Sequence, residues 1–168
     1  IQRRKDYVKR EPSRDAHKIY LVCEGKGTEP DYFRFFEGLS SNLQVITMPP
    51  ADGSDPIKLM ELAKKDLIGP GRKYTVECEH GDTVWFIIDT DTWEEEGKIK
   101  LLRDFCLVQN FSIKDQMDEV KPYPVWNVAQ SNPCFEIWLY HHFYDKKPSQ
   151  EKVGDCASFK EFVHLEIS

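Results

Sequence analysis

The sequence contains no apolar run that approaches the roughly 20 residues a membrane-spanning helix requires. Nothing in it resembles a signal peptide. Its five cysteines are odd in number, widely spread and without a C-x-x-C pair, which argues against a disulfide scaffold and against a zinc ribbon. These absences predict a protein of the cytoplasm that has reduced thiols and no contact with a membrane.

Common phosphate-binding and nucleophile motifs are also missing. A Walker A loop needs G-x-x-x-x-G-K, which the chain lacks, and the dinucleotide motif G-x-G-x-x-G would need glycine where Pro30 stands. No Ser/His/Asp set with the geometry of a nucleophile elbow is present. Gly25 and Gly27 are therefore interpreted as parts of a tight turn.

Positive charge is in short supply, because 23 basic residues against 29 acidic ones give a net charge of −6. This balance argues mildly against a protein that coats nucleic acid through phosphate contacts. It does not argue against an enzyme whose bound cations carry the positive charge. Residues 1–15 depart from the average, with six basic and three acidic residues. We interpret them as a flexible N-terminal arm, either solvated or in contact with phosphates.

The length of 168 residues is that of about one domain, which we place at residues 16–168. Apolar, β-branched runs predict strands at 18–25, 42–48, 83–89 and 123–129. Helical patterns follow each strand, and this alternation predicts an α/β fold with a mostly parallel sheet flanked by helices on both faces. The ending EFVHLEIS predicts an element that continues past residue 168.

Local signals place the helices. A T-x-x-D capping box at Thr28 opens the first, and Asp55-Pro56 opens the second. The third follows Glu94–Glu96, whose charge suits a helix N-terminus, and the fourth opens at Asn132-Pro133. The residues expected to face inward are Tyr32, Phe35, Phe36 and Leu39 in the first helix, Ile57, Met60, Ala63 and Leu67 in the second, and Ile99, Leu102, Phe105 and Cys106 in the third.

Acidic residues stand where the predicted strands end. Glu24 ends the first strand, Asp89 ends the third with Asp91 just beyond it, and Glu136 lies in the helix after the fourth. Because ligands bind at the carboxyl ends of strands in an open α/β sheet, these carboxylates are expected to converge there. Clustered carboxylates raise one another's pKa unless a cation holds them, and Mg²⁺ prefers such oxygen ligands.

Simpler interpretations exist for these acids. Asp89 and Asp91 suit a turn, since aspartate favours loops. Glu136 could merely complement the dipole of its helix. Neither Ser131 nor Asn132 as the N-cap would make Glu136 a capping-box residue, which leaves a ligand role open.

Two further polar residues near this edge are predicted to contact a substrate. Lys26 lies in the loop after Glu24, within reach of a phosphate, and a solvated loop lysine is the alternative. Asn132, after the fourth strand, is the second candidate. His141 and His142 are adjacent and point to different faces, so we assign them structural or surface roles.

Three segments resemble the RloB-like family: VCEGKGTEPDYF at 22–33, FIIDTD at 86–91 and SNPCFEIWLYHHF at 131–143. They occur in the same order within residues 18–145. VCEG followed by DTD also resembles the catalytic pattern of Toprim domains, which occur in topoisomerases, bacterial primases and OLD-type nucleases.

The resemblance implies a Toprim-like, Rossmannoid fold and Mg²⁺-dependent hydrolysis of phosphodiester bonds, with Mn²⁺ as a substitute. It also implies a role in prokaryotic antiphage or restriction-linked defence. Glu24 would be the general acid/base or a metal ligand, Asp89 and Asp91 would be catalytic and hold the metal, and Glu136 would complete the metal site. The implied substrate is DNA or RNA. The sequence has no separate ATPase or recognition module, so a partner protein would come from the same defence locus; self-association is left open.

Three other classes remain open. Residues 89–92 also fit the D-x-D-x-T motif of haloacid-dehalogenase phosphatases, whose first aspartate is a nucleophile. That fold normally starts with this strand, and it needs a later lysine and acidic pair that the sequence does not identify. A receiver-like signalling domain usually has two acids after its first strand, where only Glu24 stands. The last alternative is a partner-binding subunit without catalysis.

Overall fold

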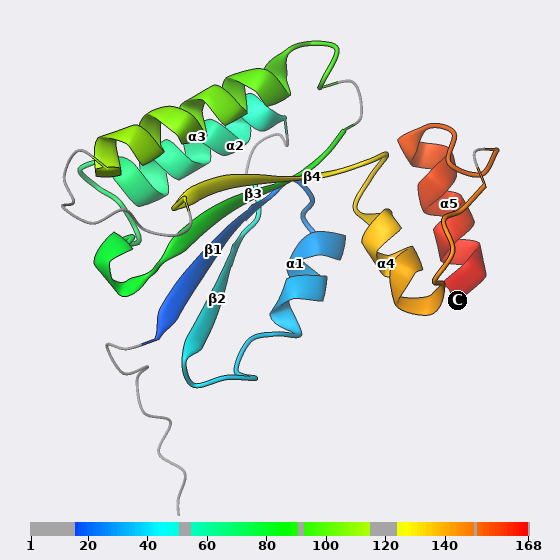
Figure 1. Cartoon of the computed structure of the whole chain (residues 1–168), viewed down its shortest axis with the longest axis horizontal. Helices are drawn as coiled ribbons and strands as arrows, with labels where there is room; N and C mark the ends of the chain where they lie inside the picture. The colour runs from blue at the N-terminus through cyan, green and yellow to red at the C-terminus, as the bar shows by residue number, and fades with distance from the viewer. Residues whose placement is uncertain (1–15, 51–54, 91–92, 115–123, 150, 168) are drawn as a thin grey trace, which may run out of the picture.

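The structure, a computed structural model, describes residues 16–50, 55–90, 93–114, 124–149 and 151–167. The predicted arm at 1–15 lies outside these ranges. A four-stranded sheet in the order β2-β1-β3-β4 forms the centre of the molecule (Figure 1), and all its pairs are parallel. Its strands are β1 (His17–Cys23), β2 (Leu43–Met48), β3 (Thr83–Asp89) and β4 (Trp126–Ser131).

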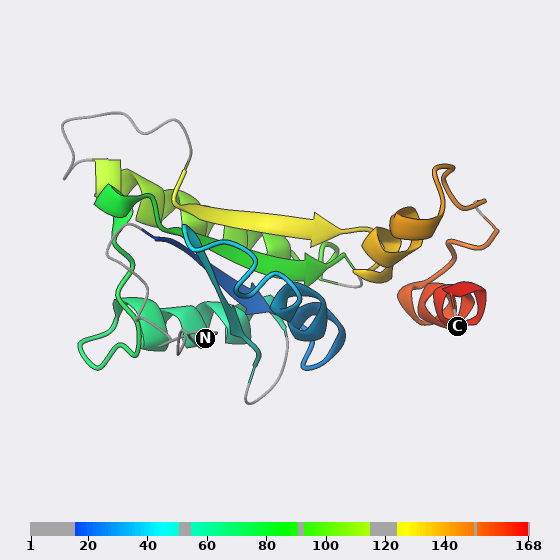
Figure 2. The same cartoon turned by 90° about the horizontal axis from the view of Figure 1, so that it is seen from below.

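Helices cover both faces of this sheet. The α-helices among the described residues are α1 (Thr28–Arg34), α2 (Pro56–Ala63), α3 (Lys98–Lys114), α4 (Glu136–Phe143) and α5 (Cys156–Ile167). A π-helical turn, Lys64–Ile68, continues α2, and a short 3₁₀ turn, Cys78–His80, precedes β3. In Figure 1, α2 and α3 lie on one face of the sheet and α1 lies on the other, while α4 and α5 lie beyond the end of β4 (Figure 2). The predicted α/β fold with a parallel sheet between helices is confirmed.

Burial on both faces explains the continuous apolar runs of the strands. Successive side chains of a strand point to opposite faces. In β1, Tyr20 and Val22 therefore join the cluster under α2 and α3, whereas Leu21 and Cys23 join the cluster under α1 and α4. A strand covered in this way needs apolar residues at every position, as parallel strands commonly do.

The helix α5 packs on α4 through a third cluster. Its buried members are Cys134, Tyr140, Phe159 and Val163. None of them belongs to the buried sets of the two clusters against the sheet. Figure 2 shows α4 and α5 side by side beyond the end of β4, so this pair forms a small lobe next to the carboxyl edge of the sheet.

The first predicted helix is wrong in two respects. Gly27 is the N-cap of α1 and no side chain caps the helix, so the capping box predicted at Thr28 does not form. The helix ends at Arg34. Phe35 and Leu39, predicted to face inward, are therefore 73% and 66% exposed, and Phe36 is also exposed. Tyr32 does pack inward, against the ring of Phe135.

The second and third helices match the prediction more closely. Asp55 Oδ1 accepts hydrogen bonds from the backbone N–H groups of Ile57 (2.9 Å) and Lys58 (3.2 Å), as expected of an N-cap. Of the residues predicted to face inward, those that are fully buried are Ala63, Leu67, Ile99, Leu102 and Cys106. Met60 and Phe105 are partly buried against the same cluster, and Ile57 is also partly buried. Leu59, which the prediction did not include, is fully buried.

The fourth helix begins later than predicted. Phe135 is the N-cap of α4 and Glu136 is its first residue, so neither Ser131 nor Asn132 caps the helix. Strand β4 extends to Ser131, two residues past the predicted end at 129. The longer strand brings Ser131 opposite Asp89 in the register of β3 and β4.

Candidate functional site

The parallel ends of β1 and β3 bring Glu24 next to Asp89. The two strands pair up to Cys23 and Ile87, and Glu24 is the residue that follows β1. Its Oε2 accepts a hydrogen bond from the backbone N–H of Asp89 (2.8 Å), and its Oε1 accepts one from the indole Nε1 of Trp93 (2.8 Å). The Glu24 carboxylate is therefore fixed against the start of the loop after β3.

Asp89 connects this strand end to the α4–α5 lobe. Its side chain is buried, and Oδ1 accepts a hydrogen bond from the backbone N–H of Phe135 (2.8 Å). Its Oδ2 lies 3.2 Å from Nζ of Lys160 and 3.8 Å from Sγ of Cys156. Asp89 thus contacts the start of α4 with one oxygen and α5 with the other.

Glu136 is the third carboxylate at this edge. Its Oε2 lies 3.9 Å from Nζ of Lys160, so the Lys160 ammonium contacts both Asp89 and Glu136. The same oxygen is buried and makes no hydrogen bond with any residue that the structure describes. A buried carboxylate oxygen with no hydrogen-bond donor is costly, and a nearby cation offsets that cost.

Glu29 is a fourth carboxylate, which the sequence analysis did not select. It is buried in α1, and its Oε1 accepts a hydrogen bond from the backbone N–H of Gly25 (3.0 Å). A Cβ atom on Gly25 would overlap the Glu29 carboxylate. Glycine at position 25 is therefore required by this close approach as well as by the turn.

Burial, with a smaller contribution from neighbouring negative charge, favours the protonated forms of Glu24 and Asp89. Burial raises the pKa of Glu24 to about 7; the charges of Asp89 and Glu29 add to this effect, and its two hydrogen bonds oppose it. Burial also raises the pKa of Asp89 to about 6, although Lys160 opposes the rise. Burial lowers the pKa of Lys160, but the charges of Asp89 and Glu136 outweigh that effect and hold it above its usual value. Removal from water is thus the main reason why these two carboxyls favour their protonated forms.

The loop that follows β3 is held by a polar network. Thr90 donates from its backbone N (2.8 Å) and its Oγ1 (2.7 Å) to the carbonyl oxygen of Ser131. Gln130 donates to Thr90 Oγ1 (3.0 Å) and accepts from Nη2 of Arg103 (2.5 Å). These contacts fix the chain between Asp89 and position 91. Asp91 itself lies outside the described residues.

The structure places the remaining candidates on the rim. Lys26 and Asn132 are exposed in the loops after β1 and β4, and their predicted substrate contacts stay predictions. His142 Nε2 lies 2.9 Å from the hydroxyl of Tyr32, and His141 Nδ1 lies 3.1 Å from the carbonyl oxygen of Tyr144. The His142 contact joins α4 to α1, and the His141 contact lies within the C-terminal turn of α4.

Sequence reasoning missed Glu29, Lys160, Cys134 and Cys156. Glu29 stands inside a segment interpreted as a helix start, where an acidic residue needs no further explanation. Lys160 follows Phe159 and precedes Phe162 and Val163, a spacing that could have predicted α5. No signal in the sequence places that helix against Asp89.

The carboxylates at this edge are of the type that binds Mg²⁺, but among the described residues no three of them have ligand atoms within 4.8 Å of one another. The magnesium site therefore stays a prediction. Four carboxylates supply the hard oxygen ligands that Mg²⁺ prefers. They are Glu24, Glu29, Asp89 and Glu136. The raised pKa values of Glu24 and Asp89 and the buried, unpartnered oxygen of Glu136 each indicate that a cation would be stabilised here. The ammonium group of Lys160 partly neutralises the negative charge of Asp89 and Glu136 in the structure.

A parallel sheet between helices, with acidic residues at its carboxyl edge, places the chain among Rossmannoid proteins. The family model described as RloB-like protein matches residues 19–164, and the chain belongs to that family. Comparison with curated proteins and with solved structures found no significant match in either set. Among the described residues, no helix is both long and apolar enough to cross a membrane.

Proposed function

We propose that the chain is a Mg²⁺-dependent, Toprim-type nuclease that hydrolyses phosphodiester bonds of DNA or RNA in prokaryotic antiphage or restriction-linked defence. The observation that supports this function is the gathering of Glu24, Asp89 and Glu136 at the carboxyl edge of the sheet. Membership of the RloB-like family supports the same proposal. A protein partner from the same locus, and Mn²⁺ as a substitute metal, belong to the proposal.

The acids have distinct roles in this mechanism. Asp89, Asp91 and Glu136 would hold the metal, with Glu29 beside them. When bound, Mg²⁺ supplies Lewis-acid stabilisation of the charge that develops on the phosphate oxygens. Glu24, fixed at the end of β1, would accept a proton from the attacking water.

Neighbouring groups keep Glu24 and the substrate in position. The hydrogen bonds from Asp89 N and Trp93 Nε1 occupy one lone pair on each Glu24 oxygen and leave the others for water. Lys26 and Asn132, exposed on the flanking loops, are proposed to contact the phosphate backbone of the substrate.

Metal binding is tested first, because it needs no knowledge of the substrate. Titration with Mn²⁺ should broaden NMR signals around residues 24, 89–91 and 136. The broadening should be lost in the Asp89→Asn/Asp91→Asn variant and retained in Glu37→Gln, which removes the charge of an exposed acid after α1. A folded wild-type chain without localised broadening would refute the magnesium site.

Cleavage is tested next, with single-stranded DNA, duplex DNA and RNA as substrates in the presence of Mg²⁺. Glu24→Gln should reduce the rate by about 100-fold or more, since a positioned base contributes about that factor. Glu37→Gln should cleave as the wild type does. An unchanged rate in Glu24→Gln would remove Glu24 from the mechanism.

One observation favours a second candidate, a phosphatase of the haloacid-dehalogenase type. Lys160 lies 3.2 Å from Oδ2 of Asp89, which supplies the lysine that the sequence alone did not identify. Asp89 would then be the nucleophile. Beryllofluoride, which mimics an aspartyl phosphate, should bind Asp89 in this case and should leave a metal-binding nuclease unlabelled.

A further inference from the structure

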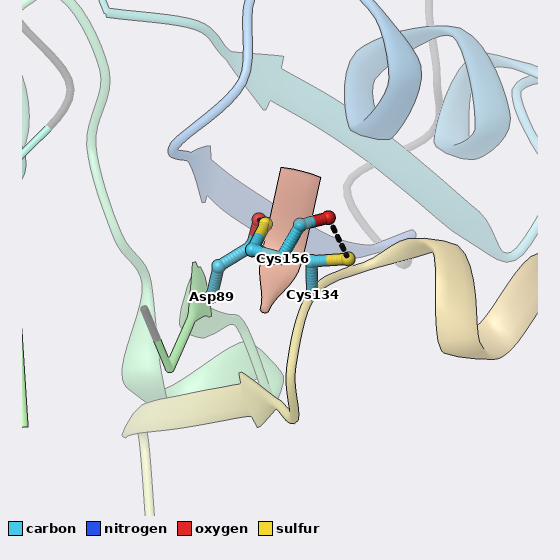
Figure 3. Close-up of side chains that lie close together, drawn as sticks. All are labelled: Asp89, Cys134 and Cys156. Carbon is cyan, nitrogen blue, oxygen red and sulfur yellow. Dashed lines mark hydrogen bonds between the residues drawn. The ribbon is translucent and has the colours of Figure 1, made fainter. Parts of the chain in front are cut away.

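Two cysteines lie beside Asp89, where the proposed nuclease chemistry does not use them. Cys134 precedes α4, Cys156 is the first residue of α5, and Asp89 ends β3 (Figure 3). One ligand atom from each of the three residues lies within 4.8 Å of the other two. Cys134 and Asp89 are buried and Cys156 is partly buried, so water competes little for these atoms.

The spacing of these atoms is close to that of a tetrahedral metal site. Bonds of about 2.3 Å to sulfur and about 2.1 Å to oxygen place neighbouring ligand atoms about 3.6 to 3.8 Å apart. The Cys156 Sγ and Asp89 Oδ2 atoms are 3.8 Å apart. The Cys134 Sγ now donates a hydrogen bond to the carbonyl oxygen of Cys156 (3.7 Å), so a shift of about 1 Å would bring it to tetrahedral spacing.

A candidate fourth ligand and an exchangeable charge lie nearby. The carboxylate of Glu136 lies outside the group of three atoms and would have to turn towards it to bind the same ion. Glu136 lies two residues after Cys134, and its buried Oε2 makes no hydrogen bond with any described residue. Lys160 contacts both Asp89 and Glu136, and about half of its side chain is exposed. A long, half-exposed lysine can turn into solvent when a divalent cation takes its place.

We propose that Asp89, Cys134 and Cys156, with Glu136 as the fourth ligand, form a binding site for a thiophilic divalent cation of the Zn²⁺ class. Two thiolates select such an ion over Mg²⁺, which prefers oxygen ligands. On binding, each thiol forms a bond to the metal and releases one proton to solvent, with no change of oxidation state. The ion would occupy Asp89 and would therefore inhibit any reaction that needs this carboxylate for magnesium.

Cobalt is a suitable probe, because Co²⁺ binds to tetrahedral thiolate sites and then absorbs in the near ultraviolet through sulfur-to-metal charge transfer. The full chain, reduced and kept free of oxygen, is titrated with Co²⁺ and then with Zn²⁺. We expect one charge-transfer band that saturates at one metal per chain and disappears when Zn²⁺ is added. This band reports thiolate ligands alone, so its outcome is independent of nuclease activity.

Single substitutions identify the ligands. Cys156→Ser should weaken Co²⁺ binding by at least ten-fold and reduce the charge-transfer band, and Cys134→Ser should do the same if the variant folds. Cys78→Ser, which changes a cysteine before β3, should leave the band unchanged. A folded wild-type chain without the band, or a Cys156→Ser variant with the wild-type band and affinity, would overturn the proposal.

Discussion

At the scale of single residues, Glu24 and Asp89 are acids whose protonated forms the fold favours. Their pKa values are raised to about 7 and about 6. In the unfolded chain these two carboxyls have their lower, ordinary pKa values. At a pH between the unfolded and folded values, the folded chain therefore keeps protons that the unfolded chain has released. It follows that these two groups stabilise the fold most at low pH and that this stability is lost as the pH rises to about 7.

We predict that the free energy of unfolding of the metal-free chain falls between pH 5 and pH 8. In Glu24→Gln, the free energy of unfolding should fall by about 2 kcal/mol less over this pH range than in the wild type, since one unit of pKa shift corresponds to about 1.4 kcal/mol. Urea unfolding at the two pH values measures the effect. Glu37→Gln is the control, and the same fall in Glu24→Gln as in the wild type would contradict the prediction.

The position of the carboxylates could be predicted where they lie at a strand end or, as for Glu136, in the helix that follows one. Glu24 and Asp89 follow continuous apolar runs, and parallel strands bring such ends to one edge. Glu29 could not be selected, because its burial depends on the turn at Gly25 folding back onto its carboxylate. Lys160 could not be selected either, because its contact with Asp89 bridges 71 positions of sequence and depends on how α5 packs.

At the scale of secondary-structure elements, the turn from β1 to α1 determines where Glu29 lies. The backbone N–H of Gly25 donates to Glu29 Oε1, and the two groups are too close to admit a side chain at position 25. The turn therefore positions an acid of the site and also starts the helix that carries it.

We predict that Gly25→Ala destabilises the fold by about 1 to 3 kcal/mol, the usual cost of forcing extra atoms into a packed site. It should also weaken Mn²⁺ binding, because the Glu29 carboxylate must move. Gly71→Ala is the matched control, since a Cβ there meets no atom within 4 Å. Thermal unfolding and the Mn²⁺ titration test both points, and equal behaviour of the two variants would contradict the prediction.

The strands were easier to predict than the helices for a physical reason. Burial on both faces forces unbroken apolar runs in the strands, and β3 was predicted with its observed bounds, 83–89. The end of α1 has no such signal, because Phe35 and Phe36 continue the apolar pattern although they are exposed. Glycine at the N-cap likewise offers no side chain from which the start of α1 could be identified.

At the scale of the whole molecule, α5 is held by a cluster whose buried residues are distinct from those of the sheet, while α4 takes part in both. Phe159 and Val163 are buried between α4 and α5, while Leu102 is buried between α3 and the sheet. The α4–α5 lobe meets the sheet at Asp89 through Cys156, Lys160 and the backbone of Phe135, and α4 also packs on the sheet through Leu139. A helix held by its own buried cluster can open separately from the sheet.

We predict that Phe159→Ala loosens α5 while the sheet stays folded, since removing a buried phenylalanine costs about 3 to 5 kcal/mol. Hydrogen exchange should become faster in α5 and at Phe135 but not in β1 or β3. Leu102→Ala, the comparison variant, should accelerate exchange throughout the sheet. Equal loss of protection in β1 for both variants would show that the lobe and the sheet open together.

The all-parallel sheet also determines the order in which the edge can be assembled during synthesis. No neighbouring strands can be joined by a tight hairpin, so β1 must wait for β3 before Glu24 meets Asp89. Lys160 follows Asp89 by 71 positions. At about 5 to 20 residues per second, a ribosome needs about 4 to 14 seconds to add that length. During this interval Lys160 has not yet been added, so the carboxylates of Glu24 and Asp89 can be exposed without its ammonium group. Cations from solution can then neutralise their negative charge.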